Sequence, residues 1–480
     1  MGESLKDKTA KGLFWGLLNN GTNQILNAAF GILLARLLVP EDYGIMAMLT
    51  IFTAIAGNLQ SSGFSTALIN MKNATQRDYN AVFWFNVLTS IAIYIILAFC
   101  APLIADYYHQ PCLVVLSRVV FFSFVIGSFG IVPNAYMTKH LMVREMAIVS
   151  FVSMVISGIA GVAFAFMGMG YWSFAWQQII QIFLFNIGRY YYISWRPDWK
   201  IDFSPIRRMF SFSIKILITM IINTLNANVL VLFIGRMFTT HSLGNYSQGN
   251  KWSTMAYQMI SGMLQQVAQP VFATAADEDE RELRIFRKMI RFSSFLAFPA
   301  LFGLALISKE FVLILVGAKW AGSILMMQIL CISGAFFPLY AIYQNLVVGK
   351  GRSDMYMWCN ILQVVFQTAL IFALYRFGIL MMVIGYAIFN IVWILPWHYF
   401  AHRIIGITLW QVVSDILPFL LASAGVMVVT YIITMPISAL WLLLLIRIPM
   451  AAALYYAVMK MARVEILDEC TQFILKKFRK

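Results

Sequence analysis

Residues 87–105 read VLTSIAIYIILAFCAPLIA, an apolar segment without a single charged side chain. Residues 416–433, ILPFLLASAGVMVVTYII, near the other end of the chain, are likewise apolar and uncharged. A helix needs about 20 predominantly apolar residues to cross a bilayer. It satisfies its own backbone hydrogen bonds in lipid, whereas transmembrane barrel strands alternate apolar and polar residues over short segments. We therefore predict an all-α, polytopic membrane protein.

The composition of the whole chain favours the same class. Of the 480 residues, 61% are hydrophobic and only 11% are charged, whereas soluble domains contain about 45–50% apolar and about 25% charged residues. The five cysteines are scattered and none forms a CxxC pair, so we expect neither a disulfide scaffold nor a cysteine metal motif. No small-residue cleavage site follows the first apolar run, and we expect this run to be retained.

Charged residues and Pro/Gly clusters divide the chain into about 14 segments that are long enough to span a bilayer. The predicted spans are residues 12–38, 43–70, 80–105, 113–137, 145–168, 170–193, 209–235, 243–273, 286–316, 321–348, 354–377, 379–402, 408–434 and 437–460. With the N-terminus inside, the outer ends hold only Arg36, Arg118, Arg236, Lys309, Lys319 and Arg376. Cytoplasmic loops collect Lys and Arg, so we predict that both termini are cytoplasmic. The same rule explains the net charge of +15 without a nucleic-acid partner.

An internal repeat with an offset of 200 residues relates the two halves of the chain. The matching positions are Leu34-Ala35-Arg36 with Ile234-Gly235-Arg236, Gly44 with Gly244, and Asn23 with Asn223, and Ser128 and Pro133 resemble Ser333 and Pro338 further on. We predict an N-terminal lobe of six spans (1–200), a second such lobe (201–404), two additional helices (405–463) and a basic amphipathic tail (464–480). Parallel repeats of this kind usually hold the substrate path at their interface.

Polar side chains inside three predicted spans recur at helical spacing. The candidate substrate-binding residues are Asn20, Asn23, Gln24 and Asn27 in the first span, Lys215, Asn223 and Asn226 in the seventh, Lys251, Gln258 and Gln265 in the eighth, and Arg36 at an outer end. Such residues are costly in lipid and usually face a cavity or another helix. Interhelical hydrogen bonding is the structural alternative for the amides, and extension to the membrane interface is the alternative for the lysines. Three stripes together favour a hydrated, cationic lumen, in which amides match sugar hydroxyls and lysines match phosphate.

Acidic residues are absent from the middle of every predicted span, and Glu310 and Asp415 approach one only near its boundary. A cation-driven exporter of cations normally needs a buried carboxylate, so the expected ligand is anionic and hydroxylated. Arg447 lies nearer the middle of a span and must face protein or water, although the sequence names no partner for it. His398 and His402 are four residues apart without a nearby carboxylate. We expect no metal, no cofactor and no catalytic site.

The first 70 residues resemble the opening of bacterial polysaccharide transporters of the MOP (multidrug/oligosaccharidyl-lipid/polysaccharide) exporter superfamily. The resemblance rests on GLFWGLLNNGTNQILNAAFGILLARLLVPEDYGIMAM (12–48) and SSGFSTALI (61–69), above all on Arg36, Pro40, Asp42, Tyr43 and Gly44. It implies two six-helix lobes around a cavity that opens alternately to each side of the bacterial cytoplasmic membrane. It also implies an undecaprenyl-diphosphate-linked oligosaccharide as substrate. In related peptidoglycan-precursor flippases the last two helices are thought to form a groove for the lipid tail, which fits the last two spans here. Those flippases carry an arginine cluster in their first spans, which this chain lacks before Arg36.

The sequence thus predicts a flippase for the assembly of O-antigen, capsule or exopolysaccharide. Its expected partners are the lipid-linked oligosaccharide, membrane lipids and other polysaccharide-assembly proteins. Two alternatives stay open at this point: a cation-coupled multidrug exporter of the same superfamily, and a membrane polysaccharide polymerase or ligase, against which the short outer loops argue. The sugar composition, the coupling ion and the oligomeric state are not encoded in any pattern that we can read.

Overall fold

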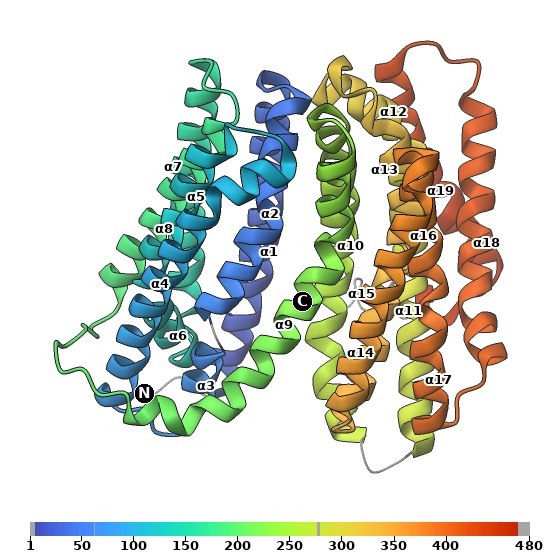
Figure 1. The fold of residues 1–480 in the computed structure, drawn as a ribbon. Helices are drawn as coiled ribbons and strands as arrows, with labels where there is room; N and C mark the ends of the chain where they lie inside the picture. Colours follow the sequence, from blue (N-terminus) through green and yellow to red (C-terminus); the bar gives the residue numbers. More distant parts are fainter. Residues whose placement is uncertain (1–4, 62, 276–278, 469–480) are drawn as a thin grey trace. The chain divides into compact units, whose positions relative to one another are not determined.

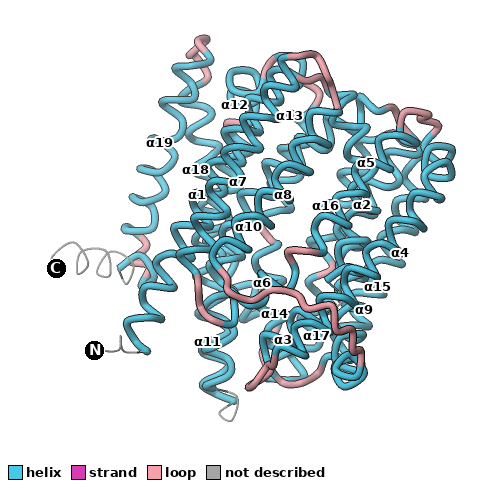
Figure 2. Tube along the Cα trace, turned by 90° about the vertical axis from the view of Figure 1, so that its left-hand side faces the viewer, coloured by secondary structure: helices cyan, strands magenta, loops and turns pink. Residues whose placement is uncertain are grey.

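The computed structural model describes residues 5–61, 63–275 and 279–468, and within these residues all regular structure is helical (Figure 2). The prediction of an all-α chain is therefore confirmed. By length and apolar composition, 10 described helices could cross a membrane, or 11 if the bent pair formed by residues 113–128 and 131–139 is one span. Each predicted span overlaps one or more helices, but the count of about 14 crossings stays a prediction.

Contacts divide the chain into two compact units, residues 1–244 and 245–480. The helices of the first unit are α1 (Leu5–Leu37), α2 (Pro40–Ser61), α3 (Phe64–Asn70), α4 (Gln76–Tyr108), α5 (Leu113–Ser128), α6 (Ile131–Lys139), α7 (Val143–Phe166), α8 (Trp172–Tyr192) and α9 (Ser204–Met237). In this unit α1 packs against α7, α7 against α8, and α4 against α5 (Figure 1). Because α9 packs against α2, α3 and α4, it belongs to this unit by contact. The lobe boundary predicted at residue 201 remains a prediction about the repeat.

The second unit takes most of α10 and all later helices. They are α10 (Thr240–Ala275), α11 (Asp279–Leu306), α12 (Ser308–Phe311), α13 (Ser323–Gly334), α14 (Phe337–Gly349), α15 (Ser353–Leu374), α16 (Ile379–Val392), α17 (Ile394–Ile405), α18 (Leu409–Thr434) and α19 (Leu440–Met461). A π-helical turn, Val312–Val316, follows α12 directly. The two helices predicted over 405–463 are α18 and α19; both pack against α11 as well as each other.

In three of the predicted spans the helix breaks just before a proline. α6, α14 and α17 carry Pro133, Pro338 and Pro396 in their first turns. A proline ring clashes with the preceding turn and removes one backbone donor, so the helix before it ends and a new helix begins. Of these pairs, α5 and α6 are bent by 44°. The breaks α5–α6 and α13–α14 fall at equivalent places of the predicted repeat.

Each unit buries an aromatic cluster and exposes apolar side chains elsewhere. Phe83 and Trp195 belong to the cluster of the first unit, and Phe286 and Trp397 to that of the second. On α18 and α19 large apolar side chains such as Ile432 (60% exposed) point away from the protein. Contiguous exposed apolar surface on this scale is stable in lipid and not in water. The fold is that of a multi-pass membrane protein.

Candidate functional site

Lys251 lies on α10 beside a buried aromatic side chain. Its Nζ is 5.3 Å from the centroid of the Trp252 ring, which packs edge-on against Phe311. Among the described residues no carboxylate comes within ion-pair distance of Lys251. One turn earlier Gln248 is fully buried, and neither polar atom of its side chain has a hydrogen-bond partner within the described chain. This part of α10 therefore carries a cation and an amide that the neighbouring protein does not satisfy.

The opposite face of α10 packs against α13. The Ser253 hydroxyl donates to the carbonyl of Leu330 at 2.8 Å, and Gly249 lies against the backbone of Met327. Successive residues of an α-helix are about 100° apart, so Lys251 lies on the side away from this contact and shares that side with Gln258. Gln258 is exposed. Lys251 and Gln258 of the predicted stripe thus lie away from the face of α10 that packs against α13.

The amide side chains of the predicted stripe on α1 have different surroundings: some contact a neighbouring helix and others are exposed. Asn23 exchanges two hydrogen bonds with Ser150 of α7, at 3.0 Å from its Nδ2 and 3.1 Å to its Oδ1. Gln24 is half-buried, and Asn27 is exposed. Asn23 therefore joins two helices, which is the structural alternative that the sequence left open, while Asn27 stays accessible.

The stripe of α9 lies beside a second interhelical contact. Asn223 and Asn226 are half-buried. Between them Thr224 accepts a hydrogen bond of 2.6 Å from Asn58 of α2, which also donates to the carbonyl of Met220 at 3.2 Å. Asn58 is a polar residue that sequence reasoning missed, because no second Asn or Gln recurs with it at helical spacing in its predicted span. Arg36 is exposed at the end of α1. The side chains of Asn20, Lys215 and Gln265 lie outside the described residues, and the role of every candidate in substrate binding stays a prediction.

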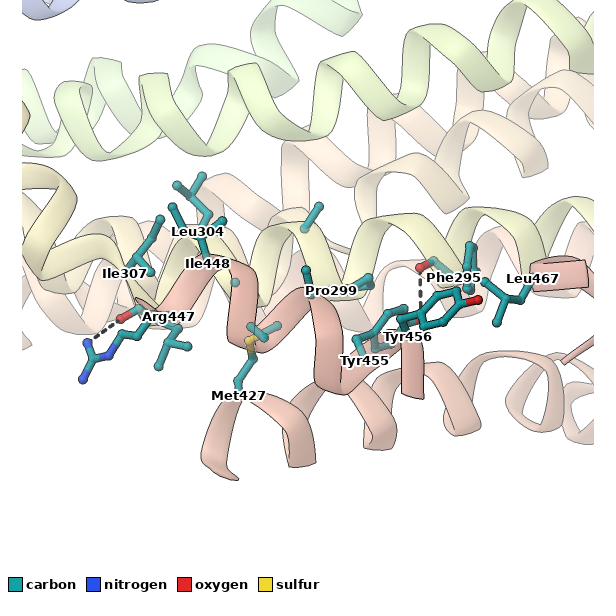
Figure 3. A pocket seen from close by; sticks show the side chains of 15 residues that line it. Phe295, Pro299, Leu304, Ile307, Met427, Arg447, Ile448, Tyr455, Tyr456 and Leu467 are labelled. Carbon is teal, nitrogen blue, oxygen red and sulfur yellow. Dashed lines mark hydrogen bonds between the residues drawn. The ribbon is translucent and has the colours of Figure 1, made fainter. Parts of the chain in front are cut away.

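An apolar groove of about 460 Å³ runs between α11, α18 and α19. Small or helix-distorting residues hollow it out, among them Pro299 and Gly303 of α11 and Ala451 and Ala452 of α19. At one end the hydroxyl of Tyr455 donates to the carbonyl of Phe295 at 3.0 Å. Figure 3 shows Arg447 at the other end of this row of side chains. Arg447 is the only charged side chain that lines the groove within the described residues.

The partner of Arg447 is Glu310, from the short helix α12. Arg447 Nη1 lies 2.8 Å from Glu310 Oε1, and the side chains are 6% and 2% exposed. The Nε atom donates to the Thr434 hydroxyl at 3.0 Å. The sequence could not name this partner, because 137 residues separate the two charges and only the packing of α12 against α19 joins them. The position of Glu310 just beyond a long apolar helix was the only available signal.

The other buried carboxylates are also occupied. Asp415 of α18 accepts from Arg287 of α11 at 2.7 and 3.0 Å and lies 3.4 Å from Arg291. Glu282 pairs with Lys350 at 2.8 Å. The remaining buried acid of the described chain, Asp78, accepts from the backbone and hydroxyl of Thr75 at the start of α4. Acids are therefore buried here, contrary to the simplest interpretation of the sequence, but a cation or a helix cap already holds each one.

The histidine pair of α17 has other partners. His398 lies 3.3 Å from the hydroxyl of Tyr343, and His402 Nδ1 lies 2.9 Å from the carbonyl of Ile407. No group of three or more His, Cys, Asp or Glu side chains is placed to hold a metal ion in the described part of the chain.

Comparison with known proteins identifies a matching family and several similar proteins. Residues 33–325 match the model of a family described as polysaccharide biosynthesis protein. The chain is 26% identical over 377 residues to the teichuronic acid biosynthesis protein TuaB of Bacillus subtilis, with 78% of each chain covered. It is 24% identical over 440 residues to the lipopolysaccharide biosynthesis protein WzxC of Escherichia coli, which covers 89% of this chain and 88% of that one.

Solved structures share the fold at low sequence identity. The lipid II flippase MurJ in an inward closed conformation superposes with a TM-score of 0.76 at 11% identity, covering 94% of this chain and 98% of that chain. An inward-facing multidrug resistance transporter of the MATE family and the MOP superfamily gives a TM-score of 0.66 at 15% identity, covering 80% and 94%. The predicted resemblance to the fold of MOP exporters is thereby confirmed.

Proposed function

Because this chain belongs to the polysaccharide biosynthesis protein family, we propose that it is a flippase for a lipid-linked oligosaccharide. The substrate that we infer is an undecaprenyl-diphosphate-linked oligosaccharide, moved across the cytoplasmic membrane by alternating access during surface polysaccharide assembly. Taking a sugar–diphosphate head through dry hydrocarbon is prohibitive, because each unpaired polar group costs several kcal/mol. A polar, cationic path removes most of this cost, so the reaction requires no covalent chemistry.

The observation that carries the proposal is which charged side chains have a partner of opposite charge and which do not. Each of the four buried carboxylates in the described chain is held by a cation or caps a helix. Lys251, in contrast, has no acidic partner among the described residues and lies one turn from the unsatisfied amide of Gln248. A half-buried ammonium with an adjacent amide suits a phosphate with hydroxyl-bearing sugars. The same distribution disfavours a cation-coupled drug exporter, which needs a free buried acid.

The groove between α11, α18 and α19 suits the lipid part of this substrate. Its walls are apolar, and it opens beside helix faces that already expose large apolar side chains. A polyprenyl chain has no hydrogen-bonding groups, so it needs only shape and apolar contact. In this proposal the tail stays in the groove or in lipid while the polar head crosses.

Translocation in vesicles tests the proposal directly. The purified full chain is reconstituted with a fluorescent undecaprenyl-diphosphate oligosaccharide, and the label that becomes accessible to an impermeant quencher is measured against time. We expect the wild type and Lys251→Arg to translocate, and Lys251→Met to lose most of the rate. Lys309→Met, at an exposed lysine of α12, is the matched control. Wild-type vesicles that move no substrate would refute the function, and a change in glycan length would favour a polymerase or ligase.

A further inference from the structure

The guanidinium of Arg447 uses only part of its hydrogen-bonding capacity. Its Nε donates to Thr434 at 3.0 Å, and its Nη1 donates to Glu310 at 2.8 Å and makes a long contact of 3.5 Å with the carbonyl of Leu306. An arginine has five N–H donors, and within the described chain no hydrogen bond from Nη2 accompanies these three. The Oε2 atom of Glu310 is also buried without a described partner. Incomplete pairing of a buried ion pair is costly, so a further polar group at this place would stabilise it.

The position of this guanidinium in the fold is fixed by the ends of two helices and by the short helix α12. Leu306 and Thr434 are the last residues of α11 and α18, and Glu310 lies in the helix that follows α11. The carbonyl ends of helices carry partial negative charge, which favours a cation there. The ring of Tyr431, 5.3 Å from the guanidinium carbon, provides a further cation–π contact. Arg447 is therefore held beside the carbonyl ends of α11 and α18.

The groove extends from this cation along α19. Tyr455, near the other end, is eight residues away, or about 12 Å along a helix. Between the two ends the described lining is apolar (Figure 3). An occupant that matches this surface has an apolar chain of at least that length and an anionic group at one end.

We propose that Arg447 binds the phosphate group of the isoprenoid carrier whose chain occupies the groove. This inference rests on the proposed function and adds a phosphate site at the end of the groove, distinct from Lys251 on α10. Arginine presents a planar fork of donors to phosphate oxygens and remains charged under all relevant conditions. The Nη2 edge is the part of that fork that the protein leaves open.

Glu310 has a defined part in this arrangement. Its Oε1 orients the guanidinium, and its negative charge partly cancels the attraction of Arg447 for a phosphate. A bound carrier can then leave again, as transport requires. The inference therefore predicts that Glu310→Gln, which keeps an acceptor at this position and removes the charge, binds the phosphate lipid more tightly. A purely structural ion pair predicts no such gain.

Competition binding to the purified full chain in detergent tests the site. Native mass spectrometry measures the occupancy by three probes: undecaprenyl phosphate, undecaprenol and phosphatidylglycerol. We expect the wild type to prefer undecaprenyl phosphate over undecaprenol by about tenfold, as one charge-assisted hydrogen bond provides. Arg447→Met should bind both equally while still binding undecaprenol, and Glu310→Gln should increase the preference. Arg447→Lys should retain part of it.

A folding control keeps the test decisive. Arg447→Met alone leaves Glu310 buried and unpaired, so the double variant Arg447→Met/Glu310→Leu, which removes both charges, serves where the single variant is unstable. A preference that survives in either variant, or equal binding of both isoprenoids to the wild type, would overturn the inference. Phosphatidylglycerol that binds as tightly as undecaprenyl phosphate would overturn the assignment to the carrier. Translocation by wild-type vesicles is scored separately, so a failure of this site and a failure of the proposed function give different results.

Discussion

Gly44 and Gly244 pack reciprocally against the first residues of each other's helices. Gly44 of α2 lies against the carbonyl of Thr240, which starts α10, and Gly244 of α10 lies against the carbonyl of Pro40, which starts α2. A side chain at either glycine would overlap the opposite backbone. The two positions are 200 residues apart, which is the offset of the predicted repeat. Two positions that match in the predicted repeat are therefore also close neighbours in the structure.

Alanine at Gly44 or Gly244 should weaken this contact. The added methyl group must displace backbone and cannot rotate away, so we expect a loss of about 1–3 kcal/mol in the free energy of unfolding. Thermal unfolding of the purified chain measures it. Gly57→Ala, in the middle of the same helix α2 with nothing within 4 Å of the new methyl group, is the control and should be neutral or slightly stabilising. Equal effects at positions 44 and 57 would contradict the steric explanation.

Asn23 and Ser150 should behave as a structural pair. Because they exchange hydrogen bonds between α1 and α7, Asn23→Ala should cost about 0.6 kcal/mol of stability, the average for such bonds in a membrane protein. A double-mutant cycle with Ser150→Ala measures the coupling. Translocation should be largely retained in both single variants. A large loss of transport without a loss of stability would instead place Asn23 in the substrate path.

Asp415 should contribute more to stability than an exposed acid does. Asp415→Asn removes a charge that Arg287 and Arg291 of α11 share, so we expect unfolding to become easier by about 1–3 kcal/mol. Asp354→Asn is the matched control, since its pair with Arg352 at 3.6 Å is exposed on both sides and surface pairs contribute little. Chemical denaturation with a probe on α18 compares the two, and similar losses would argue against a role of Asp415 in holding α18 to α11.

The loop before α9 should loosen in acid. Backbone and side-chain donors of Ser204, together with Arg77, lower the pKa of Asp202. A carboxyl whose folded pKa is depressed stabilises the fold above its ordinary value of about 4, and this contribution is lost as the pH falls through the folded pKa. Limited proteolysis of residues 194–203 should therefore accelerate in acid in the wild type. Asp202→Asn should show the fast rate already at neutral pH, and a rate independent of pH in the wild type would refute this.

The sequence allowed the helical class and the positions of the apolar helices to be predicted, because both depend on local patterns, whereas the repeat stays a prediction. The breaks within spans were not predicted: Pro338 was noted only as a match within the repeat, and the span 321–348, expected to be one helix, is divided into α13 and α14. Ion-pair partners could not be predicted. Glu310 and Arg447 meet only because α12 packs against α19, and a hydropathy pattern contains no information on which helices are neighbours.

The same limit applies to the amide stripes. Periodicity correctly predicted that Lys251 and Gln258 share one face, because that follows from helix geometry alone. It could not tell that Asn23 faces Ser150 while Asn27 is exposed, since both lie on the same predicted stripe. Which neighbour a helical face meets is decided by tertiary packing, and a single sequence gives no measure of it.

The hollow between α11 and α19 exists because side-chain volume is missing at positions such as Gly303. A methyl group there would reach only ordinary van der Waals contact, 3.6 Å from the terminal carbon of Met427, whereas larger groups would intrude into the open space. Replacing Gly303 by alanine, valine and leucine in turn therefore measures how wide a hydrocarbon chain the groove can accommodate.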